Sequence, residues 1–166
     1  MNALADQKVG DYLNEHFVSS FQKVGTFRIV NDEKQGGNVA SYFLTPDRRV
    51  LHVVAGPANA RTLLREARWV VEIYKAAQLE APDDPDALRS IFRKAHADRL
   101  QKEHKLDVAT IDEWHPQRAL NLQGKVHLLM TAAPLVKLER AYKVVFENIL
   151  GEKVSTDPVE DSSVAQ

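Results

Sequence analysis

The stretch Lys34-Gln-Gly-Gly-Asn-Val-Ala-Ser-Tyr-Phe-Leu-Thr-Pro-Asp-Arg-Arg-Val-Leu-His-Val-Val-Ala-Gly56 decides the fold of this chain. Two runs rich in apolar and β-branched residues, 39–44 and 50–54, flank the short link Thr45-Pro-Asp-Arg48. Proline fixes φ at a value that suits the second position of a type I turn. Two strands joined by so short a link are antiparallel neighbours, so the stretch predicts a β-hairpin.

A long helix is predicted directly after the hairpin. Gly56-Pro57 ends the second strand, and Asn59 can cap the helix that follows. Apolar residues then share one helical face: Leu63, Leu64, Ala67, Val70, Val71 and Tyr74. A second, nearly opposite stripe holds Trp69, Ile73 and Ala76. A helix that is apolar on two sides is usually covered on two sides, so we expect the sheet on one side and a second layer on the other.

The flanking segments complete the expected order of elements. Apolar residues at helical period predict a helix that ends near residues 14–16, followed by strands over 17–24 and 26–30 and a polar loop over 31–37. Asp84 before Pro85 predicts a helix over 85–104. Further helices are predicted at about 117–132 and 136–150, with Gly151 as the stop.

The order of helix, strand, loop, hairpin and helix resembles a thioredoxin-like domain. The segment Asp6-Gln-Lys-Val-Gly-Asp-Tyr-Leu-Asn-Glu-His-Phe-Val18 resembles the end of the first thioredoxin helix, and Phe43-Leu-Thr-Pro-Asp47 resembles the hairpin of that family. The resemblance covers about residues 3–77 and implies an α/β fold. We therefore expect a thioredoxin-like domain over 1–80, a helical extension packed on it over 83–151, and a disordered acidic tail over 152–166.

The family's redox chemistry does not carry over. The chain has no cysteine, and thiol-disulfide exchange needs a thiolate. The family's first strand with its Cys-x-x-Cys has no counterpart, and no proline stands near Gly37-Asn38-Val39, where the family has its cis-proline. We expect a sheet without its first strand. Residues 26–30, a partner chain or a segment of a longer precursor would fill the open position.

Composition limits the classes of function. The 166 residues carry a formal net charge of -1, which gives no general attraction for nucleic acid or for an acidic membrane. The roughly 18 consecutive apolar residues of a membrane span are lacking, and no signal peptide is visible. We expect no membrane association and no nucleic-acid binding. The compartment stays open, with the cytoplasm favoured.

Individual side chains suggest contact surfaces rather than chemistry. The six histidines, at 16, 52, 96, 104, 115 and 127, lack metal-ligand spacing, so we interpret them as solvated or satisfied and expect no metal, cofactor or catalytic residue. Trp69, Ile73 and Ala76 are the candidate contact with a homodimer mate or protein partner, although packing against the chain's own C-terminal helices is favoured. Arg89, Arg93 and Lys94 could contact an anion, although a solvated face is favoured because stacking aromatics are missing.

The leading functional hypothesis is a redox-inactive thioredoxin-like module for protein interaction or scaffolding. The alternative is a glutathione-transferase-like enzyme or a ligand-binding protein, since a thioredoxin-like half followed by helices looks like that layout. The missing cis-proline and first strand count against this alternative. Fold alone does not decide between them.

Overall fold

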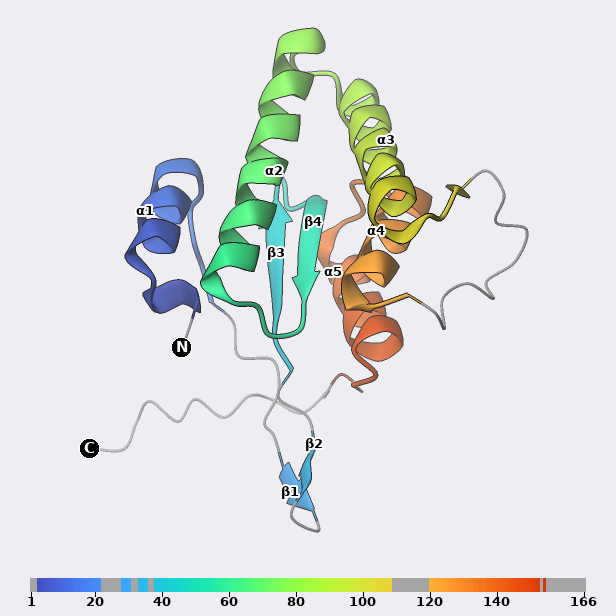
Figure 1. Ribbon diagram of the computed structural model, residues 1–166. Helices are drawn as coiled ribbons and strands as arrows, with labels where there is room; N and C mark the ends of the chain where they lie inside the picture. The colour runs from blue at the N-terminus through green and yellow to red at the C-terminus, as the bar shows by residue number, and fades with distance from the viewer. Residues whose placement is uncertain are drawn as a thin grey trace.

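The computed structural model describes residues 3–21, 28–30, 33–35, 38–108, 120–152 and 154. Within this part the chain is a mixed α/β protein, in which helices lie on both faces of a two-stranded antiparallel sheet (Figure 1). No helix among the described residues is both long enough and apolar enough to cross a membrane.

The predicted hairpin is confirmed. Strand β3 (Ala40–Leu44) pairs antiparallel with strand β4 (Val50–Ala55). Their register shifts once: Phe43 lies opposite His52, whereas Leu44 lies opposite Val50. Leu51 is therefore an extra residue in β4, which makes a β-bulge. All six residues of β4 are buried, so this strand is the centre of the structure.

Two helices cover one face of the sheet. Helix α1 (Gln7–His16) follows a short 3-10 turn at Ala3–Ala5, and helix α2 (Ala60–Glu80) follows the hairpin. The predicted cap of α2 is confirmed, because the Asn59 side chain accepts the backbone N–H of Thr62 at 2.9 Å. The core on this side is built by residues from all of these elements: Val9, Phe43, Leu51, Val54, Leu63, Ala67 and Val70.

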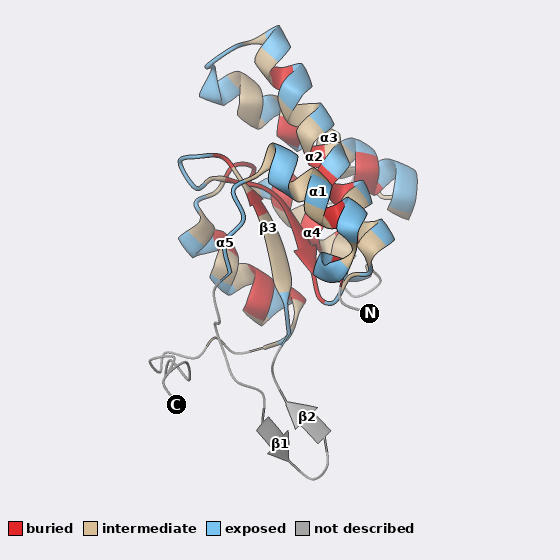
Figure 2. Cartoon of the chain, turned by 90° about the vertical axis from the view of Figure 1, so that its left-hand side faces the viewer, coloured by how far each residue is buried: buried red, intermediate tan, exposed pale blue. Residues whose placement is uncertain are grey.

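The C-terminal helices cover the other face and the outer edge of β4. Helix α3 (Pro85–His104) begins as predicted, with Asp84 as its cap, and packs against α2 and helix α4 (Leu122–Ala132). Helix α5 (Leu138–Val144) continues into a π-helical turn at Val145–Ile149. A second core lies between β4 and these helices, and Figure 2 shows buried residues on the sides of α2, α3 and α4 that face the sheet.

Side chains from α3 and α4 occupy the edge of β4 that β3 leaves open. His96 Nε2 lies 2.9 Å from the Leu51 carbonyl oxygen, and Gln123 Nε2 donates to the Val53 carbonyl oxygen at 2.9 Å. The helical extension is therefore bonded directly to the hairpin.

Three sequence-based expectations need correction. Residues 17–21 form no strand, and Val18 and Phe21 are almost fully exposed, so no neighbouring strand covers them in the described chain. The segment expected as a loop contains strand β2 (Glu33–Gln35), which pairs with β1 (Arg28–Val30), because a two-residue link favours local hairpin pairing. Helix α4 begins at residue 122 rather than 117, because Asn121 caps it. Predictions for 22–24, for 109–119 and for most of the tail lie outside the described residues.

Candidate functional site: a buried histidine centre

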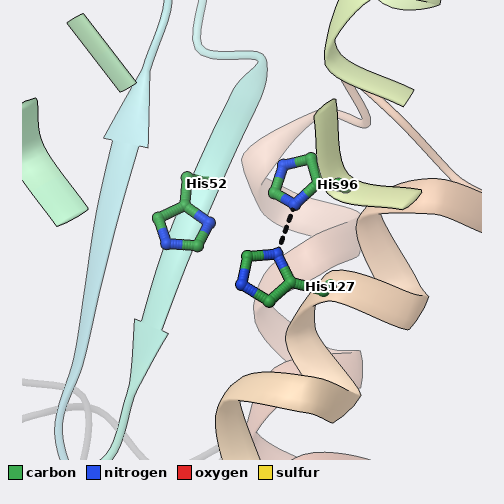
Figure 3. A group of neighbouring side chains, drawn as sticks. All are labelled: His52, His96 and His127. Atoms are coloured by element: carbon green, nitrogen blue, oxygen red, sulfur yellow. Dashed lines mark hydrogen bonds between the residues drawn. The ribbon is translucent and has the colours of Figure 1, made fainter. Parts of the chain in front are cut away.

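Three histidines from distant parts of the chain meet beside β4. His52 comes from β4, His96 from α3 and His127 from α4, and Figure 3 shows their rings turned toward one another. Each ring offers one nitrogen, and these three atoms lie within 4.8 Å of one another. All three side chains are fully buried. We call this cluster, His52, His96 and His127, the histidine centre.

A hydrogen bond to a carboxylate fixes the proton of His52. Its Nε2 lies 3.1 Å from Oε2 of Glu66, a buried residue of α2. Burial by itself would raise the pKa of Glu66, but hydrogen bonds from His52 and Arg99 outweigh that effect and hold the pKa below its ordinary value. The carboxylate is therefore ionised and can only accept. The amide nitrogen of Gln123 also lies 3.3 Å from His52 Nε2, but the charged carboxylate is closer and can only accept. His52 Nε2 therefore carries the hydrogen, and the lone pair of His52 is on Nδ1.

A backbone carbonyl fixes the proton of His96 in the same way. The Leu51 carbonyl can only accept, so His96 Nε2 carries the hydrogen and His96 Nδ1 carries the lone pair. His96 Nδ1 lies 2.8 Å from His127 Nδ1, so the His127 atom must be the donor. The lone pair of His127 is consequently on its Nε2. Hydrogen-bond geometry thus assigns the neutral form of every ring in the centre.

Two of these lone pairs have no partner. His52 Nδ1 and His127 Nε2 are buried nitrogens to which no described group donates a hydrogen bond. Buried polar atoms are normally paired, and each unpaired one costs about 1–3 kcal/mol. The histidine centre therefore contains acceptor nitrogens that no hydrogen-bond donor or cation among the described residues satisfies.

Burial keeps the three imidazoles neutral. Burial lowers the pKa of His52 and of His127, and it lowers the pKa of His96 to about 3. A charge on His52 would lower the pKa of His96 and of His127 further, because like charges repel. An imidazole that is neutral near pH 7 needs to lose no proton before it binds a metal ion. The three rings are therefore neutral, and none has to lose a proton to bind a cation.

Charged residues next to the centre balance one another. Arg99 bonds both oxygens of Glu66 and donates through Nε to Glu103 at 2.8 Å, while Arg65 donates to Glu66 Oε1 at 2.7 Å. The Arg99 guanidinium also lies 4.8 Å from the centre of the Trp69 ring. These two carboxylates and two guanidiniums sum to no net charge, so a bound cation would not meet an excess of positive charge.

Of the residues predicted as contact surfaces, Trp69 packs on the histidine centre, and the others lie outside it. Trp69 is half-buried and packs edge-on against His52 and His96, with ring centres 5.0 Å apart in both pairs. Ile73 is half-buried beside the core, whereas Ala76 is exposed. On α3, Arg89 pairs with Asp86, Lys94 pairs with Asp98, and Arg93 is exposed. Their roles in binding a partner or an anion stay predictions.

Sequence spacing does not reveal the histidine centre. His96 and His127 are 31 residues apart, and His52 belongs to a third element. One signal was present, since His52 interrupts the apolar run Val50-Leu-His-Val-Val54 and His96 follows the inward Phe92 by one helical turn. The expectation that the histidines are satisfied fails for three nitrogens: His52 Nδ1, His104 Nε2 and His127 Nε2. The expectation of no metal site is untested.

A search against protein-family models, curated proteins and solved structures gives no significant match. The chemistry of the histidine centre is therefore inferred from its own geometry.

Proposed function

We propose that the chain binds a divalent transition-metal ion, Zn²⁺ in the simplest case, through His52, His96 and His127. The observation that carries the proposal is the convergence of one nitrogen from each of three buried histidines, within 4.8 Å of one another, with the lone pair of His52 Nδ1 unpartnered. A metal ion would take the His52 lone pair as it stands, and those of His96 and His127 once the hydrogen between their Nδ1 atoms has moved to His127 Nε2. Imidazole nitrogen is a preferred ligand of zinc, copper, nickel and iron.

The groups around the ligands support this reading. A histidine that binds a metal usually donates its other N–H to a carboxylate or a backbone carbonyl, which orients the ring. His52 has Glu66 for this purpose, and His96 has the Leu51 carbonyl. Both arrangements leave the lone pair directed away from the orienting group. His127 would bind the ion through Nδ1 after its proton moves to Nε2, because in the present tautomer the Nδ1 hydrogen of His127 occupies the His96 lone pair.

The distances between the nitrogens of the centre are close to those between the ligands of a bound zinc ion. Zinc–nitrogen bonds of about 2.0–2.1 Å in a tetrahedral site place ligand nitrogens about 3.4 Å apart. The Nδ1 atoms of His96 and His127, at 2.8 Å, are slightly closer, and the set of three nitrogens lies within 4.8 Å. Ring rotations that move nitrogens by about 1 Å would reach that geometry. Three protein ligands leave a fourth position for water or hydroxide.

Full burial favours a structural or sensing role for the ion. The ligands come from β4, α3 and α4, so one ion would join the hairpin to the helical extension. Ligands that bind only the folded chain stabilise it. The competing explanation is a metal-free cluster held by the His96–His127 hydrogen bond. That explanation leaves the lone pair of His52 Nδ1 without a role.

A cobalt titration separates the two explanations. We expect chelator-treated protein to bind one Co²⁺ per chain, with the visible absorption of tetrahedral cobalt, and Zn²⁺ to displace it. Cobalt should quench Trp69 fluorescence in a Trp114→Phe background, because Trp69 touches the histidine rings. His127→Gln should weaken binding at least a hundredfold. His16→Gln, on α1, is the matched control. A metal-free cluster predicts no stoichiometric binding, or equal effects of the two variants.

The hypothesis of a redox-inactive thioredoxin-like interaction module is the second candidate. The exposed apolar side chains of Val18 and Phe21, after α1, favour it, because together with the lack of cysteine they offer contact without chemistry. A solution mass that rises with protein concentration, and no longer rises in Phe21→Ser, would support it. A constant mass in both would oppose self-association. The glutathione-transferase-like alternative predicts a thermal shift with glutathione.

A further inference from the structure

One face of α2 carries a hollow of about 520 Å³. The residues that line it come from successive turns of this helix: Arg61, Leu64, Arg65, Arg68, Trp69 and Glu72. From Arg61 to Glu72 the helix rises about 16 Å, so the hollow is a long, open groove on the protein surface. Its volume is within the range of small-molecule sites, which span about 300–1,000 Å³.

The groove carries a net positive charge in an otherwise balanced chain. Three guanidiniums line it against the carboxylate of Glu72, while the chain as a whole has a net charge of -1. Because Arg65 also pairs with the buried Glu66, the excess charge rests mainly on Arg61 and Arg68. Arg61 and Arg65 are one helical turn apart, about 6 Å along the axis, and Arg68 lies on the next turn. This spacing suits a ligand that carries two or more negative groups.

Two of the arginines are already held in place. Arg65 donates through Nε and Nη2 to Glu66 Oε1, at 2.9 and 2.7 Å. The Arg68 guanidinium lies 5.5 Å from the centre of the Tyr12 ring. Arg61 has no ion pair or hydrogen bond with the described residues. Ordered guanidiniums lose less conformational entropy on binding, and their planar donors match carboxylate and phosphate oxygens.

We propose that this groove binds a small polyanion, either a polyphosphate or a polycarboxylate, through Arg61, Arg65 and Arg68. This activity is separate from the metal binding proposed above, because no ligand nitrogen of the histidine centre lines the groove. The small volume argues for a compact ligand, and the charge argues for an anionic one. Trp69 lines the groove, so its fluorescence should report occupancy.

The test is calorimetric titration of the full chain with tripolyphosphate and, separately, with citrate. At least one should bind with a one-to-one stoichiometry at low salt, more weakly at high salt, and should change Trp69 fluorescence in a Trp114→Phe background. Tripolyphosphate alone would identify a phosphate ligand, and citrate alone a carboxylate ligand. Absence of binding by both would overturn the proposal.

Matched double variants locate the binding. Arg61→Gln with Arg68→Gln should weaken affinity at least tenfold, whereas Arg140→Gln with Lys143→Gln, two exposed cations of α5, should change it less than twofold. Equal weakening by the two pairs would overturn the proposed groove in favour of general charge attraction. His127→Gln removes a ligand of the histidine centre and should leave anion binding within twofold, so the two proposals fail separately.

Discussion

His96 Nε2 donates to the Leu51 carbonyl oxygen at 2.9 Å, and this bond connects α3 to the bulge in β4. The Leu51 carbonyl lies on the edge of β4 that β3 leaves open, so it is available to a side chain, as the Val53 carbonyl is to Gln123. The bond places the hydrogen of His96 on Nε2 and its lone pair on Nδ1. The open edge of β4 therefore sets the atom that His96 presents to the histidine centre.

Glu66→Gln should be strongly destabilising. The substitution removes the charge that Arg99 and Arg65 pair with, and it weakens the acceptor that orients His52. Breaking one side of a buried ion pair costs about 3–5 kcal/mol, and losing a group that orients a ligand costs about 10–100-fold in metal affinity. Urea unfolding of chelator-treated protein and cobalt titration measure the two effects. Glu72→Gln, an exposed change on the same helix, should stay within about 0.5 kcal/mol.

Stability should fall as the pH drops below about 6.5, the ordinary pKa of histidine. The folded pKa values of His52, His96 and His127 are lowered by burial, so the unfolded chain takes up protons first. Each histidine then removes up to about 1.4 kcal/mol of stability per pH unit. Denaturant unfolding of metal-free protein at pH 7.5, 6.5 and 5.5 measures this slope. His127→Gln should make the slope shallower, and an unchanged slope would contradict the assignment of neutral rings.

Zinc should stabilise the folded chain. At a free concentration one hundred times its dissociation constant, an ion that binds only the folded state adds about 2.7 kcal/mol. Thermal unfolding with Zn²⁺ and with excess chelator measures the difference. Mg²⁺ should give no comparable shift, because it prefers oxygen ligands. A zinc effect that persists in His52→Gln would place the ion elsewhere.

Lys105→Gly should stabilise the end of α3. Lys105 has φ of 57°, in the left-handed region where a side chain is unfavourable and glycine is not. We expect a gain of about 0.5–1 kcal/mol in the free energy of unfolding. Lys102→Gly, inside the same helix, should lose about 1 kcal/mol. Equal signs for the two variants in urea unfolding would show that the backbone argument does not hold.

The elements that sequence predicts well are those with local signals. The hairpin follows from the link at Thr45–Arg48, and α3 follows from Asp84 before Pro85. The ribbon of β1 and β2 was missed because its second strand, Glu-Lys-Gln, has no apolar pattern. The histidine centre was missed because its members meet only after three elements have packed, and no spacing in the sequence records that event. The thioredoxin-like resemblance stays a prediction.

The hydrogen bonds from His96 and Gln123 to the outer edge of β4 have a consequence for folding during synthesis. The donors that satisfy the Leu51 and Val53 carbonyls lie 45 and 70 residues further along the chain. Contacts so distant in sequence form late, because closing long loops costs entropy. We therefore expect the hairpin and α2 to assemble while the chain is still being made, before α4 emerges to cover the outer edge of β4. We expect the histidine centre to close later, when β4, α3 and α4 come together.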